Sequence, residues 1–213
     1  RSFHVTGVQT CALPISVRLA VRLYGGEDAY RRGSYDFYRV IAQTFVDGHG
    51  LCVGPGVQCG LRLPLYPLLL SPFVATGTLY PWLVVLHAVF GAAIVWCVWD
   101  AARRVFGAPA GAIAAVLAAC SPYAAVHDTA LQDTVVVNLA VAAAFALLVR
   151  ASRDDARVTP WLWAGVALAA AVMTTARVSL FLPGALAWTL VRRRDRPGLA
   201  LRQVLCVALP AAL

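Results

Sequence analysis

The chain has 213 residues, of which 61 % are apolar and 13 % are charged, and its mean hydropathy is +0.73. Soluble domains are roughly half apolar and a quarter charged, so this composition excludes an ordinary soluble protein and indicates an integral membrane protein. The formal net charge is +8, and all 18 basic residues are arginines. These arginines lie in short clusters between apolar runs, a pattern that favours membrane topology over nucleic-acid binding.

The first residues do not match the rest of the chain. Residues 5–15, VTGVQTCALPI, resemble the translation of a common sequencing adapter, so residues 1–16 are excluded from fold reasoning. Native sequence is expected to begin near Val17, with residues 17–24 as the end of a truncated first span. The apolar run 204–213 is about half the roughly 20 residues that a span requires, so a truncated last span is also expected.

Residues 25–80 are predicted to form a long extracytoplasmic loop that carries interfacial helices. Its polar part, residues 25–62, holds Glu27, Asp28 and Asp36, and an amphipathic pattern over residues 36–46 predicts a short helix lying in the interface. Asp36 falls at the N-terminal end of that helix, where a carboxylate is favoured either as a cap or as a catalytic acid. Cys52 and Cys59 flank a Gly/Pro-rich turn, and a disulfide is expected there if the loop is extracytoplasmic.

The next apolar segment, residues 63–75, is short for a span and contains three prolines. We interpret it as an interfacial or re-entrant segment. The alternative, an ordinary short span, would move every later arginine cluster to the outside.

A transmembrane bundle is predicted over residues 81–213. The expected spans are residues 79–102, 107–126, 131–149, 160–176, 178–191 and 204–213. Placing the arginines near residues 103, 150–157 and 192–196 on the cytoplasmic side satisfies the positive-inside rule at every turn. His87 lies inside the first of these spans and is expected to be a buried structural histidine. The cysteine and histidine spacings fit no metal site; a divalent metal is an open alternative that the sequence does not indicate.

Several motifs resemble the polyprenyl-phosphate-dependent membrane glycosyltransferases of the GT-C type. YDFYRVIAQ (35–43), DGHG (47–50) and RLPLYP (62–67) are similar to the first external loop of the protein-mannosyltransferase and aminoarabinose-transferase enzymes, including the rhizobial galacturonosyltransferase-like group. AARRVFG (101–107) resembles an "ARRLFG" turn, and SPY (121–123) with LQD (131–133) resembles an "SP…TE" loop, with Asp133 for the usual Glu. TARV (175–178) resembles a "TRP" element with Val178 for proline. The likeness covers residues 17–213 and implies a GT-C-like helical bundle.

The resemblance implies the roles of individual residues. An acid of the first loop acts as general base on the acceptor hydroxyl, and basic residues bind the phosphate of a polyprenyl-phosphate sugar donor. Asp36 is then the base, and Arg62 and Arg177 bind the donor phosphate, with Asp133, His127 and Tyr38 in support. The family's acid usually stands four residues before Tyr38, where this chain has Ser34, so Glu27 and Asp28 are rivals for the base.

The resemblance implies an enzyme of the bacterial inner membrane whose site faces the periplasm. A sugar would pass from the lipid-linked donor to a lipid, glycan or protein acceptor, with the bilayer as partner and no nucleic acid. The charged residues lie at span ends and in the outer loop rather than at the midplane, which favours surface chemistry over the alternative of a transporter or lipid-handling protein. An inactive fragment of such an enzyme is the third alternative, because of Ser34.

Overall fold

The computed structural model describes residues 14–20, 24, 36–54, 57–60, 62–128, 130–153, 158–192 and 197–212. The regular secondary structure within these residues is helical, apart from an isolated β-bridge between Cys52 and Cys59. The elements are α3 (Phe37–Val46), α4 (Leu65–Ala75), α5 (Leu79–Phe106), α6 (Ala108–Ala119), α7 (Pro122–His127), α8 (Thr134–Ala151), α9 (Thr159–Val172), η2 (Ala176–Leu180), α10 (Phe181–Arg192) and α11 (Pro197–Ala212). Residues 14–20 are also helical.

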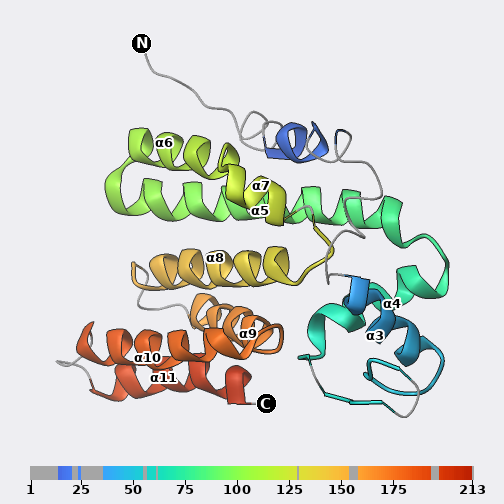
Figure 1. Ribbon diagram of the computed structural model, residues 1–213. Coiled ribbons are helices and arrows are strands. Elements are labelled where there is room, and N and C mark those ends of the chain that lie inside the picture. Colours follow the sequence, from blue (N-terminus) through green and yellow to red (C-terminus); the bar gives the residue numbers. More distant parts are fainter. Residues whose placement is uncertain are drawn as a thin grey trace.

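The long helices run side by side, with α3 and α4 at one end of the bundle (Figure 1). α5 packs against α6 and α8, α8 against α9, and α11 against both α9 and α10. At 1.5 Å per residue, α8 is about 27 Å long, close to the roughly 30 Å of a bilayer core. Among the described residues, α5 and α8 are long and apolar enough to cross a membrane, and shorter apolar helices accompany them.

One predicted span, 107–126, is interrupted. It is divided into α6 and α7, because Ser121 is extended before Pro122 and its hydroxyl caps the Ala124 N–H. The run 160–191, predicted as the two spans 160–176 and 178–191, is divided near the predicted point: the extended backbone of Thr175 separates α9 from η2 and α10.

The proline-rich segment forms one helix, α4, rather than a broken one. Pro64 is its N-cap and Pro67 lies in its first turn, where the backbone N–H groups need no helical partner. Pro72 alone lies in the helix interior.

At one end of the bundle, which we call the arginine end, the arginines of three helices meet. Asp100 on α5 is fully buried and accepts hydrogen bonds from Arg103 (3.0 Å), Arg104 (2.8 Å) and Arg150 of α8 (2.7 Å). Arg192 of α10 donates to the carbonyl of Ser152 at 2.7 Å. These contacts connect α5 with α8, and α10 with the turn that follows α8.

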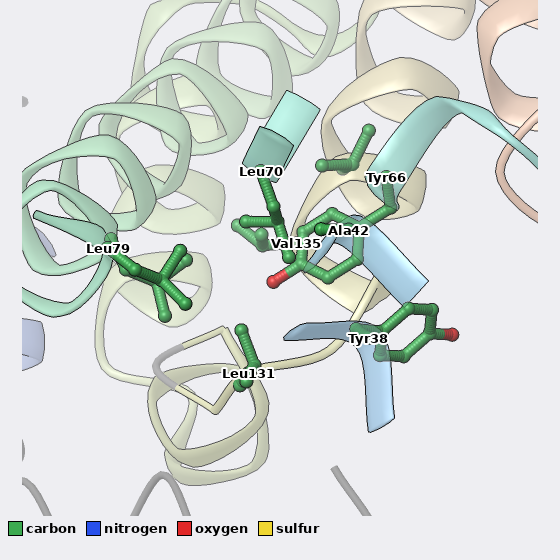
Figure 2. Packing of buried hydrophobic residues seen from close by; sticks show 9 residues of the cluster. Tyr38, Ala42, Tyr66, Leu70, Leu79, Leu131 and Val135 are labelled. Carbon is green, nitrogen blue, oxygen red and sulfur yellow. The ribbon is translucent and has the colours of Figure 1, made fainter. Parts of the chain in front are cut away.

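The opposite end, which we call the loop end, has its own apolar core. Figure 2 shows side chains of α3, α4, the start of α5 and the start of α8 packed together. Tyr38 contacts Tyr66 edge-on with ring centroids 5.0 Å apart, and the Tyr66 hydroxyl is hydrogen-bonded to His87 Nε2 at 3.3 Å. His87 is buried, as predicted. This core fixes α3, and with it Asp36, against the ends of α5 and α8.

Candidate active site at the loop end

Asp36 stands at the first turn of α3 and is held by Arg39 one turn later. Arg39 Nε and Nη2 donate to the two carboxylate oxygens of Asp36 at 2.8 and 2.7 Å. The Asp36 carboxylate raises the pKa of Arg39, and the Tyr80 hydroxyl group raises it further, so the guanidinium stays charged. The side chains of Asp36 and Arg39 are 35 % and 38 % exposed, so both are partly accessible to solvent at the loop end.

Arg62 lies beside the same helix. Its guanidinium carbon is 5.0 Å from the ring centroid of Phe37 and 6.0 Å from that of Tyr38. Arg62 is exposed while the rings beneath it are partly or fully buried, a cation–π arrangement that orients the charge without neutralising it. The guanidinium therefore keeps donors available for an anion.

Tyr38 connects α3 with the start of α8. Its ring packs in one apolar core with Leu131 and Val135, the residues on either side of Asp133, which is the N-cap residue of α8. Burial raises the pKa of Tyr38 well above its ordinary value, and the negative charge of Asp133 raises it further, while Arg62 lowers it in part. Tyr38 is therefore a neutral hydrogen-bond donor near physiological pH.

A disulfide joins Cys52 to Cys59 in the hairpin that leads to Arg62. The hairpin is tied to α3 by the Thr44 hydroxyl, which donates to the carbonyl of Cys52. The cross-link restricts the chain three residues before Arg62, and so helps to place the guanidinium over Phe37.

Two further predicted residues lie in neighbouring segments. His127, at the end of α7, is bonded through Nδ1 to Gln132 Nε2 (2.8 Å) and stacks on Tyr123. Arg177 is exposed on η2 and follows Met173, whose carbonyl accepts a hydrogen bond from the Leu65 N–H of α4. The rival acids Glu27 and Asp28 lie outside the described residues.

The structure thus brings together Asp36, Tyr38, Arg62 and Asp133 and adds Arg39, whose role sequence reasoning missed. The i,i+3 spacing of Asp36 and Arg39 was the signal that could have found it. Within the described part of the chain, no group of three or more His, Cys, Asp or Glu side chains is arranged to hold a metal ion.

The comparison with protein families decides the class. The description of the dolichyl-phosphate-mannose-protein mannosyltransferase family matches residues 64–213. The chain belongs to this family. It is therefore a GT-C-type glycosyltransferase, an α-helical membrane-integral protein, and the matched region includes His127, Asp133 and Arg177 but begins after Arg62. No curated protein and no solved structure matches the chain.

Proposed function

We propose that the enzyme transfers a sugar from a polyprenyl-phosphate donor to a hydroxyl acceptor at the outer leaflet of a bacterial inner membrane. The observation that carries this proposal is the loop-end cluster. The partly exposed carboxylate of Asp36 lies at the start of α3, and the exposed guanidinium of Arg62 lies over the ring of Phe37, the next residue. A carboxylate can take a proton, and a guanidinium can bind a phosphate. Glycosyl transfer from a lipid phosphate requires both.

In the proposed reaction, Asp36 is the general base. It takes the proton of the acceptor hydroxyl while the hydroxyl oxygen bonds to the anomeric carbon. The bond between that carbon and the phosphate oxygen breaks, and its electron pair leaves with the polyprenyl phosphate. The two hydrogen bonds from Arg39 orient the carboxylate.

Arg62 is proposed to stabilise the negative charge that grows on the departing phosphate, with Arg177 as a second ligand. Asp133 and Tyr38 support the position of α3, and His127 supports the loop that carries Asp133. The exposed Arg62 guanidinium has the fork geometry that suits two phosphate oxygens. Glu27 and Asp28 stay alternatives to Asp36 as the base.

The proposed sidedness is supported by the separation of charges along the bundle. The C-terminal ends of α5, α8 and α10 lie at the end of the bundle opposite α3 and α4 (Figure 1), and the last turns of these helices carry Arg103, Arg104, Arg150 and Arg192. Cytoplasmic turns are the ones enriched in arginine, so the arginine end faces the cytoplasm and the loop end faces the periplasm.

The role of Asp36 predicts that Asp36→Asn lowers the transfer rate by roughly 10²–10⁴-fold, the usual contribution of a general base. The measurement is sugar transfer from a polyprenyl-phosphate donor by the full chain in membranes. Asp47→Asn is the matched control, because Asp47 is an exposed acid at the other end of α3 that is bonded only locally, by Gln43 at 2.9 Å. Asp47→Asn should transfer sugar at the rate of the unaltered chain.

Glu27→Gln and Asp28→Asn complete the set. If Asp36→Asn transfers at the original rate while one of these two variants does not, the role of base moves to that residue. If the unaltered chain transfers no sugar from any polyprenyl-phosphate donor, the proposed function fails.

A further inference from the structure

A buried ion pair connects two segments that lie far apart in the sequence. Arg18 Nη2 donates to Asp128 Oδ2 at 2.5 Å, and the two side chains are 1 % and 0 % exposed. Asn138 of α8 donates from Nδ2 to the other carboxylate oxygen at 3.3 Å. Isolated charges are costly in an apolar interior, so each member of this pair needs the other.

The α5 helix accommodates this pair at a glycine. A Cβ placed on Gly91 would lie 2.1 Å from Arg18 Nε and 2.6 Å from its Cζ. Glycine is unfavourable in the interior of a helix, so the presence of Gly91 here is explained by the space that the Arg18 guanidinium needs. Three helical segments thus meet at one charged contact: residues 14–20, α5 and the end of α7.

The ion pair lies at the start of the short segment that leads to Asp133. Asp128 is the C-cap of α7, and the chain reaches the N-cap of α8 five residues later. Between them, Leu131 is fully buried in the loop-end core and Gln132 bonds back to His127. Asp133 follows at the N-cap of α8, and Leu131 packs with Tyr38 of α3 in the same core. A rigid anchor at Asp128 therefore fixes where Asp133 meets α3.

We infer that Arg18 and Asp128 are positioning residues that hold the α7–α8 connection, and through Asp133 and Tyr38 set the pose of α3 in the active site. This inference rests on the proposed function of the loop end. The pair does not touch the proposed reacting groups; it acts through the segment 130–133. A displacement of about 1 Å at a catalytic group lowers rates by roughly 100-fold, so a loosened anchor should reduce turnover even in a folded protein.

The first test compares charge variants of the full chain in lipid nanodiscs. Arg18→Leu and Asp128→Asn each leave one buried charge, and each should speed amide hydrogen exchange at residues 130–133 by about tenfold and lower kcat by roughly 100-fold. The reversed pair, Arg18→Asp with Asp128→Arg, should restore both readings toward those of the unaltered chain. Arg18→Leu with Asp128→Leu removes both charges and should fold, but it should keep fast exchange because Asn138 loses its acceptor.

The second test removes no charge. Gly91→Ala adds a methyl group in the space of the Arg18 guanidinium, so it should displace Arg18 and speed exchange at residues 130–133 as well. Gly184→Ala in α10 is the matched control, because a Cβ there meets nothing within 4 Å. It should change neither exchange nor kcat.

Unchanged exchange at residues 130–133 in both single charge variants, or slow exchange and full kcat in the double leucine variant, would overturn the inference. The exchange measurement does not need sugar transfer. A chain that transfers no sugar therefore refutes the proposed function alone, while the exchange rates still decide whether the ion pair holds the segment.

Discussion

Tyr38 combines three contacts in one side chain. Its ring packs on Tyr66, its face lies under Arg62, and it shares an apolar core with Leu131 and Val135 beside Asp133. Burial and the nearby carboxylate both disfavour the phenolate, so these contacts favour a neutral phenol. The pKa of Tyr38 is accordingly raised, first by burial and then by Asp133.

The raised pKa predicts an alkaline loss of stability. The pKa of Tyr38 is higher in the folded protein than its ordinary value of 10.0, so its contribution is fully present below about pH 10 and is lost as the pH rises toward the folded-state pKa. Tyr38→Phe should therefore show a shallower decline of melting temperature between pH 9 and pH 11 than the unaltered chain.

Tyr123→Phe is the control for the removal of a tyrosine hydroxyl that is not buried, because Tyr123 is 67 % exposed. Equal alkaline slopes for Tyr38→Phe and the unaltered chain would contradict the raised pKa of Tyr38.

At the scale of the elements, α9 and α11 approach each other very closely. A Cβ on Gly165 would lie 2.6 Å from the Cys206 carbonyl oxygen and 2.9 Å from the Val207 Cα. These are backbone atoms, which cannot turn aside as a flexible side chain can. Small residues at such crossings allow the backbones of membrane helices to pack by van der Waals contact.

Gly165→Ala should therefore force α9 and α11 apart and destabilise the protein by about 1–3 kcal/mol, as overpacking usually does. Gly198→Ala, near the start of α11, is the control, because a Cβ there meets nothing within 4 Å. Thermal unfolding in detergent measures both. If Gly165→Ala melts no lower than Gly198→Ala, the close crossing does not exist in the membrane.

At the scale of the whole molecule, the two ends of the bundle differ in chemistry. The arginine end holds Asp100 among three arginines, with Trp99 and Trp96 stacked beneath Arg103 and Arg150. The loop end holds Asp36, Asp133, Tyr38, Tyr66 and Arg62. Tryptophan and arginine together are typical of a helix end at a membrane–water interface, with arginine favouring the cytoplasmic side.

This polarity predicts the result of cysteine labelling in a background that lacks Cys11, Cys97, Cys120 and Cys206. A membrane-impermeant maleimide added to intact cells with a permeable outer membrane should label Thr76→Cys, at the loop end, and not Phe106→Cys, at the arginine end. Both positions are exposed. Inside-out vesicles should give the reverse. Labelling of Thr76→Cys only from the cytoplasm would reverse the proposed orientation and place the candidate site inside.

Part of the candidate site was predictable from local sequence. The amphipathic pattern over residues 36–46 predicted α3 with Asp36 at its start, and α3 covers Phe37–Val46. The motifs predicted a GT-C-type glycosyltransferase, and the family match over residues 64–213 confirms that class. Patterns of this kind are carried by neighbouring residues, so they need no knowledge of the fold.

By itself, the sequence determined the membrane class, the helical architecture and the family, because composition, apolar run length and short motifs are local properties. The tertiary structure alone decided which charges meet. Arg18 and Asp128 are separated by 110 residues, and Tyr38 finds Asp133 only when α3 packs on the start of α8. Local spacing cannot predict such pairs, since their geometry depends on how whole helices cross, and a buried charge gains its partner only when that packing is complete.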